Sequence, residues 1–146
     1  YIEMFGYKCT LQTDTEVITY IIDYLVRRRG LTLEETARVL AASFWSTIAD
    51  KGEEAKEQET LLRRMFPSLL VTGPFSIILG YTGGLMALGD RLKLRSMVCA
   101  EKGDKAYISS EESAIRRIEP NLDRVWSPAG GESVVFELYG KGGLAR

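Results

Sequence analysis

The sequence predicts an α+β fold in which helices come first and an antiparallel sheet follows. Apolar residues recur with helical spacing in the first half of the chain, after residues that typically begin helices. In the second half, short β-prone runs are separated by glycine-containing turns, with one short helix among them. Helices and strands that segregate along a chain in this way are typical of α+β proteins, in which helices cover one face of a sheet.

The first predicted helix begins at a capping box formed by Thr13 and Glu16. The apolar residues that follow lie on one helical face and are expected to pack on the sheet: Val17, Ile18, Ile21, Ile22 and Leu25. Three consecutive arginines, 27–29, complement the negative end of the helix dipole. Gly30 is expected to end the helix in the left-handed conformation.

Another capping box, Thr32 with Glu35, predicts a second helix over residues 32–50. The charged stretch 51–59 contains a glycine and is interpreted as a break or an exposed turn. Residues 61–66 have the spacing of a short amphipathic helix, which the following proline helps to end.

Two β-hairpins are predicted next. Residues 75–81 and 85–88 flank a Thr-Gly-Gly turn, and residues 96–100 and 105–108 flank a Lys-Gly-Asp turn. Both strands of the first hairpin are apolar at most positions, so part of this sheet is expected to be covered on two faces.

A short helix over 111–118 and strands over 124–126 and 133–138 complete the predicted antiparallel meander. Residues 140–146 are rich in glycine and predict a tail or linker, which leaves residues 1–139 as one domain portion.

Composition narrows the functional classes. The 146 residues are 45% hydrophobic and 27% charged with a net charge of −1, without the basic face of a nucleic-acid-binding protein. No apolar run approaches the roughly 20 residues of a membrane helix. The chain has two cysteines and no histidine, which favours a reducing cytoplasm, makes zinc binding a poor fit, and excludes Ser-His-Asp or Cys-His catalysis by this chain alone.

Two stretches resemble motifs of the class II glutamine amidotransferases, the N-terminal-nucleophile enzymes. Residues 13–18 have the sequence Thr-Asp-Thr-Glu-Val-Ile and follow a Gly-Tyr pair at residues 6–7, as in the family. Residues 89–95 resemble the family's Asp-Arg-x-Gly-Leu-Arg-Pro loop. The Asp-Arg pair at residues 90–91 is more similar to the glutamate synthase branch of this family than to its other branches. Lys93 stands where the family usually has glycine, and Ser96 where it usually has proline. Helix 32–50 and the charged stretch that follows it resemble an insertion relative to the short helices of the family's sugar and purine enzymes.

The resemblance spans about residues 5–138 and covers the second half of the family's domain. It implies part of an αββα N-terminal-nucleophile hydrolase sandwich that hydrolyses glutamine to glutamate and ammonia for a synthase. In this resemblance Asp14 is the substrate-binding residue, whose carboxylate holds the α-ammonium group of glutamine. The alternative role for Asp14 is helix stabilisation alone, since acidic side chains are favoured in the first turn of a helix.

The family's catalytic groups are absent from this sequence. Members carry an N-terminal cysteine nucleophile, an arginine that binds the glutamine carboxylate, and an Asn-Gly pair that forms the oxyanion hole. Cys9 is internal and has no histidine partner, and Cys99 lies in an apolar strand where a core position is expected. We therefore assign no catalytic residue to this chain.

The resemblance also implies partners. These are glutamine, the missing N-terminal half of the domain, and a synthase domain or subunit, in which FMN and iron–sulfur clusters would lie; no cofactor is assigned to this chain. Half a domain is expected to expose an edge and to form oligomers. Two alternatives are a non-catalytic regulatory module that binds an amino acid through Asp14, and an assembly module that completes a partner's sheet.

Overall fold

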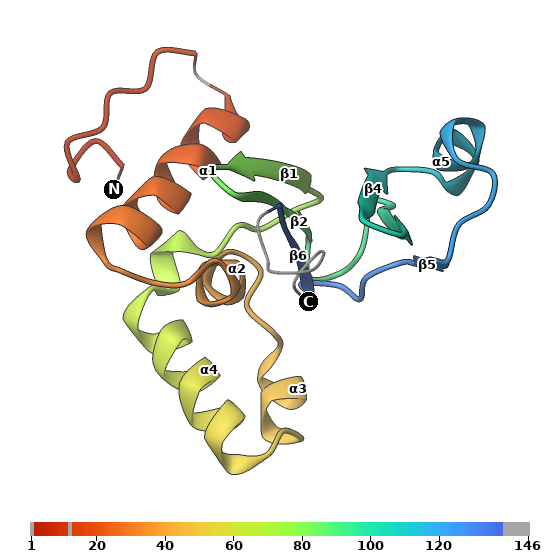
Figure 1. Ribbon diagram of the computed structural model, residues 1–146. Coiled ribbons are helices and arrows are strands. Elements are labelled where there is room, and N and C mark those ends of the chain that lie inside the picture. Colours follow the sequence, from red (N-terminus) through yellow and green to blue (C-terminus); the bar gives the residue numbers. More distant parts are fainter. Residues whose placement is uncertain (1, 12, 139–146) are drawn as a thin grey trace.

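The chain forms a mixed α+β structure with helices beside antiparallel sheets (Figure 1). The computed structural model describes residues 2–11 and 13–138, so the predicted tail over 140–146 lies outside the described residues. Within this part, one three-stranded sheet has the order β1 (Ser76–Tyr81), β2 (Gly84–Gly89), β6 (Ser133–Glu137). The other has the order β4 (Lys105–Ser109), β3 (Val98–Lys102), β5 (Arg124–Trp126).

Both predicted hairpins are confirmed. In β1–β2, Tyr81 pairs with Gly84, and Gly83 adopts a φ of 102° in the turn between them. In β3–β4, Lys102 pairs with Lys105. The turns contain glycine because a positive φ strains residues that carry a side chain.

A single meander was the wrong expectation, since the strands divide between two sheets. β5 returns to pair with β3, whereas β6 pairs with β2 on the side away from β1, with Phe136 opposite Leu85. Strand order depends on pairing between segments far apart in the sequence, which local patterns do not report.

The first helix follows the prediction. Helix α1 (Asp14–Asp23) continues into a π-helical turn, η1 (Tyr24–Arg28), and Gly30 has a φ of 72°. Helix α2 (Leu33–Leu40) begins with a complete capping box, in which Thr32 and Glu35 each accept a hydrogen bond from the other's backbone N–H.

The continuous helix predicted over 32–50 is wrong. Helix α2 ends at Leu40, and the separate helix α3 (Trp45–Ala49) follows an irregular link. The backbone N–H of Val71 donates to the carbonyl oxygen of Leu40 at 2.9 Å. The carbonyl that would accept from Phe44 in a continuing helix therefore has a partner from another segment.

The break or exposed turn predicted over 51–59 is confirmed only as a break at its start, between α3 and residue 53, because residues 53–59 are helical. Helix α4 (Glu53–Met65) begins directly after Gly52 and includes residues 61–65 of the predicted amphipathic segment, with Phe66 as its C-cap. Glutamate, lysine, glutamine and alanine are good helix formers, so a charged composition did not prevent helix formation. A 3-10 turn, η2 (Pro67–Leu69), leads to β1, and helix α5 (Glu112–Ile118) follows β4.

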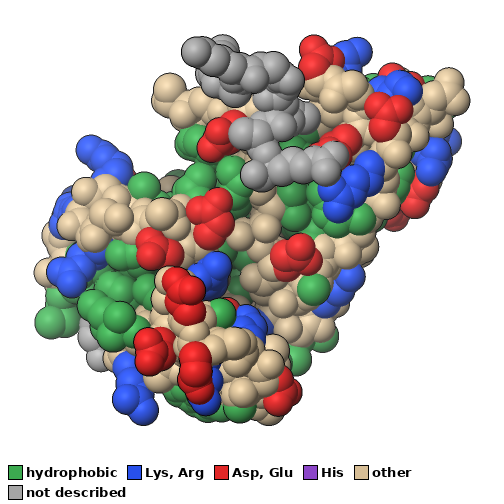
Figure 2. Space-filling view, turned by 60° about the horizontal axis from the view of Figure 1, so that its bottom comes forward, with side chains coloured by type: hydrophobic (Ala, Val, Ile, Leu, Met, Phe, Trp, Pro, Cys, Tyr) green, Lys and Arg blue, Asp and Glu red, His purple; other side chains and the backbone are tan. Residues whose placement is uncertain are grey.

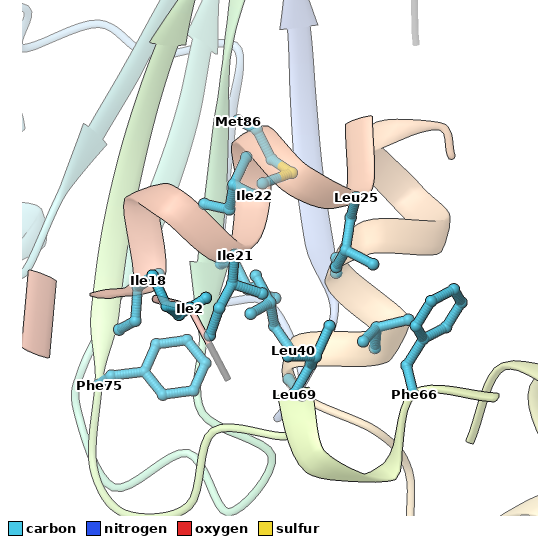
Figure 3. Close-up of a cluster of buried hydrophobic side chains, with 14 residues drawn as sticks. Ile2, Ile18, Ile21, Ile22, Leu25, Leu40, Phe66, Leu69, Phe75 and Met86 are labelled. Atoms are coloured by element: carbon cyan, nitrogen blue, oxygen red, sulfur yellow. The ribbon is translucent and has the colours of Figure 1, made fainter. Parts of the chain in front are cut away.

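Apolar side chains from α1, α2, η2 and the first sheet form the main core (Figure 3). Ile21, Leu25 and Leu40 from the helices meet Met86 and Leu88 of β2 in this cluster. It also includes Ile2, so the segment before α1 takes part in the core.

A smaller cluster lies between the two sheets. Ala87 and Phe136 of the first sheet pack with Met97 and Cys99 at β3 of the second. Because Met86 and Ala87 belong to different clusters, β2 is buried on both faces, as predicted for this hairpin. The order from helices to first sheet to second sheet is visible in Figure 1.

None of the helices within residues 2–11 and 13–138 is long and apolar enough to cross a membrane.

Candidate functional site

Asp14, the predicted substrate-binding residue, is the first residue of α1 and is exposed. The preceding Thr13 caps the helix, and its side chain accepts a hydrogen bond from the Glu16 backbone N–H at 3.2 Å. One Asp14 oxygen, Oδ1, accepts from the backbone N–H of Thr15 at 2.8 Å and from its hydroxyl at 3.4 Å. These bonds orient the carboxylate beside the positive end of the helix dipole, where it remains open to solvent.

Glu16 binds the segment before the helix. Its buried carboxylate accepts from the backbone N–H groups of Thr10 and Leu11, both at 2.8 Å, and from the Tyr20 hydroxyl at 3.3 Å. The Thr10 N–H is the main reason why the pKa of Glu16 is lower than usual, although desolvation opposes the shift. Glu16 therefore fixes the backbone that leads to Asp14.

Aromatic side chains attach the start of the chain to the same helix. The Tyr7 ring stacks on Tyr20 with 4.9 Å between centroids, and its hydroxyl donates to Asp23 Oδ2 at 2.5 Å. The Arg28 guanidinium lies 4.4 Å from the centre of the Tyr7 ring. The conformation around Asp14 is thus supported along the length of α1 and into η1.

A groove of about 260 Å³ runs between α1 and the outer strand β1. Thr15 and Thr19 supply polar atoms on the helix side, and residues 76–79 form the other wall. Asp14 is not a lining residue, but its neighbour Thr15 is. The exposed carboxylate therefore lies next to a groove that has both apolar and hydrogen-bonding surface.

The second motif, residues 89–95, forms a loop around Asp90. This aspartate is 2% exposed and accepts from the backbone N–H groups of Leu92 at 2.9 Å, Leu94 at 3.1 Å and Arg95 at 3.4 Å. Burial alone would raise the pKa of Asp90, but these donors outweigh it and hold the pKa below its ordinary value. Lys93 has a φ of 55°.

The loop before β6 packs directly on this Asp90 loop. The Gly131 N–H donates to the Asp90 carbonyl oxygen at 3.2 Å, and a Cβ atom on Gly130 would lie 2.4 Å from the Arg91 carbonyl oxygen. The loop before β6 and the Asp90 loop therefore touch, which the sequence did not predict. Neither loop shares a hydrogen bond with Asp14 among the described residues.

The cysteines differ in environment. Cys99 is fully buried between the sheets, and desolvation, reinforced by nearby glutamates, raises the pKa of its thiol to about 11. A thiol with this pKa is protonated at neutral pH and is a poor nucleophile, in agreement with the expected core role. Cys9 is partly buried and packs against the main core.

Charged side chains of both signs are interspersed on the face of the molecule in Figure 2. This face shows no extended basic patch. Within the described part of the chain, no group of three or more His, Cys, Asp or Glu side chains could hold a metal ion.

Comparisons with known proteins identify one informative similarity. The chain is 45% identical over 138 residues to an uncharacterized protein of Archaeoglobus fulgidus. The match covers 94% of this chain and 36% of that protein, so the chain spans about a third of the length of this relative. No family model and no solved structure matches the chain.

Proposed function

We propose that this chain is the C-terminal portion of a class II glutamine amidotransferase domain, of the glutamate synthase type. The domain would hydrolyse glutamine and deliver ammonia to a synthase. The observation that carries the proposal is Asp14, which combines a family-like motif with an exposed carboxylate fixed at the start of α1.

The chemistry of this carboxylate suits an ammonium group. Oδ1 is occupied by the N–H and hydroxyl of Thr15, so the side chain is oriented while its charge still faces solvent. A charge-assisted hydrogen bond is stronger than a neutral one, and an oriented acceptor loses less entropy on binding than a mobile surface side chain. The adjacent groove offers space for the remainder of an amino acid.

The conformation of Lys93 also supports the resemblance. This residue stands where the amidotransferase loop usually has glycine, and its φ of 55° lies in the left-handed region that glycine favours. The loop therefore has a glycine-like conformation despite the substitution. A helical layer on the first sheet, and a second sheet joined to the first through a small apolar cluster, further support part of a sandwich of the proposed kind.

The proposed reaction divides between this chain and the missing half. An N-terminal cysteine there would attack the glutamine amide, form a thioester and release ammonia, and water would then release glutamate. Asp14 would hold the substrate's α-ammonium group, while the loops around Asp90 would support the domain. FMN and iron–sulfur clusters, which supply redox chemistry, would belong to associated synthase domains and not to this chain.

The proposal is tested by producing this chain together with a polypeptide that begins with cysteine and carries the arginine and the Asn-Gly pair. The full-length A. fulgidus relative should be assayed in parallel. We expect glutamine-dependent release of glutamate and ammonia. If the assembled protein bound glutamine without hydrolysing it, the regulatory alternative would replace this proposal, and if it did neither, the assembly alternative would remain.

A further inference from the structure

A second pocket, separate from the groove beside α1, lies between the helices α2 and α4 and the loop before β6. Its volume is about 480 Å³, within the range of roughly 300–1,000 Å³ that is usual for small-molecule sites. Asp14 is not among its lining residues. Its charged lining residues have both signs: Glu34, Arg38, Lys51, Glu59 and Glu132.

Glu59 is the most informative residue of this pocket. It is 8% exposed, and its Oε1 atom accepts a hydrogen bond from the Lys51 ammonium group. Its Oε2 atom is buried and has no hydrogen-bond partner in the described structure. A buried carboxylate oxygen without a donor is costly, so Glu59 offers an acceptor that a ligand with N–H groups would satisfy.

Positive charge lies in the same pocket. The side chain of Lys51 is 33% exposed and holds further N–H donors beyond the one shared with Glu59. Arg38 is exposed, with one nitrogen 3.4 Å from Gln58 Oε1. A guanidinium has five N–H donors in a fixed plane, so Arg38 retains donors that match a carboxylate.

We infer that this pocket binds a free α-amino acid as a zwitterion. The carboxylate of the ligand would bind Arg38 and Lys51, and its ammonium group would donate to Glu59. A ligand with both charges matches the lining, whereas a simple anion would leave the Glu59 oxygen without a donor. A metal ion is a poor alternative because the acidic side chains of the described region do not form a metal-binding group.

This site is independent of the proposed glutaminase activity. It would give the protein a second position at which an amino acid is sensed, apart from Asp14. The loop that lines the pocket also contacts the Asp90 loop, since the Gly131 N–H donates to the Asp90 carbonyl oxygen.

The test is calorimetric titration of the full chain with the standard L-amino acids, one at a time. For the amino acid that binds, the matched amine without the carboxylate and the matched acid without the amino group are titrated as well. We expect saturable binding of at least one amino acid and binding about tenfold or more weaker for both matched compounds, because each loses one charge-assisted contact.

Variants then locate the binding. Glu59→Gln and Arg38→Gln should each weaken it by about tenfold or more. The matched control Glu57→Gln changes an exposed glutamate on the same helix and should leave affinity unchanged. Asp14→Asn separates this binding from the glutamine binding proposed for Asp14. Because Arg38 is exposed, its variant decides the result if Glu59→Gln does not fold.

Absence of amino-acid binding, or unchanged affinity in Arg38→Gln, would overturn the inference. Binding that is lost in Asp14→Asn and retained in Arg38→Gln would also overturn it and would assign the ligand to Asp14. A wild-type chain that binds at this pocket but proves inactive as a glutaminase would leave the inference standing while the proposed function failed.

Discussion

At the scale of single residues, Lys93 carries a local strain that has a measurable consequence. Its left-handed backbone costs a residue with a side chain roughly 1–2 kcal/mol, and glycine avoids this cost. Glycine also gains conformational entropy in the unfolded chain, which offsets roughly 0.4–1 kcal/mol of the stability gained by removing the strain. We therefore expect Lys93→Gly to raise the free energy of unfolding by about 0.5–1 kcal/mol in urea denaturation.

The matched control for this change is Lys105→Gly, in strand β4, where the backbone does not have a positive φ. It should lower stability, because glycine in a strand costs entropy and loses packing. A lower free energy of unfolding for Lys93→Gly would contradict this prediction. It would show that the Lys93 side chain stabilises the fold by more than its strained backbone destabilises it.

The sequence predicted some residue environments well and others poorly, for a physical reason. Asp14 and its cap were predictable because helix caps involve residues three or four positions apart. The burial of Cys99 followed from its apolar surroundings. Glu59 was not predicted as a buried acid, because its environment depends on Lys51 and on the α2–α4 packing, which composition does not encode.

At the scale of elements, helix α1 holds two carboxylates whose pKa values are lowered in the folded chain. The N–H of Thr10 is the largest cause for Glu16, and the Tyr7 hydroxyl is the largest cause for Asp23. Each carboxylate therefore binds protons less readily when folded. Their stabilising effect is present above the unfolded pKa values and is lost as the pH falls through the lower folded values.

We expect the melting temperature to fall as the pH decreases below roughly 4, where the unfolded carboxylates begin to take up protons. The measurement is thermal unfolding followed by circular dichroism between pH 7 and pH 2.5. Tyr7→Phe should reduce the pH dependence because Asp23 loses its main hydrogen bond. An unchanged melting temperature across this interval would contradict the assigned interactions.

Helix boundaries show where sequence patterns were insufficient. The capping signals correctly indicated where α1 and α2 begin, because these signals are local. The end of α2 depends on Val71, which is distant in the sequence and binds the Leu40 carbonyl oxygen. Charged residues 51–59 were interpreted as a break or an exposed turn, although helix propensity and the Lys51–Glu59 ion pair favour a helix from residue 53.

At the scale of the whole molecule, the outer strand β1 is the place where self-association is expected. Within the described residues β1 pairs with β2 on one side, and Ile78 is 57% exposed. An apolar strand edge invites pairing with another chain, and a charged side chain discourages it. We expect the isolated chain to self-associate in sedimentation velocity and Ile78→Lys to shift it towards monomer.

Ile118→Lys provides the matched control, because Ile118 is 77% exposed but lies on helix α5. It should leave association unchanged. A wild-type chain that remained monomeric with a cooperative melt would contradict the expected unpaired edge.

The class and the hairpins of the fold were predictable, whereas its topology was not. Adjacent strands joined by glycine turns pair locally, as β1–β2 and β3–β4 do. The contacts that divide the strands into two sheets join residues such as Met86 and Val135, which are far apart in the sequence. The contact between the Asp90 loop and the loop before β6 follows from this topology, so the sequence did not reveal it.

The most direct test of the proposed function is the Michaelis constant for glutamine after Asp14→Ala in the assembled enzyme. In the assembled enzyme, the other half of the domain and the bound glutamine would cover the Asp14 carboxylate. Loss of such a buried ammonium–carboxylate pair costs roughly 2–5 kcal/mol, so we expect KM for glutamine to rise about 30-fold or more. Ammonia-dependent synthesis should persist, and the control Glu54→Ala, an exposed first-turn glutamate of α4, should behave like wild type. An unchanged KM in Asp14→Ala would contradict the assignment of Asp14 as the glutamine anchor.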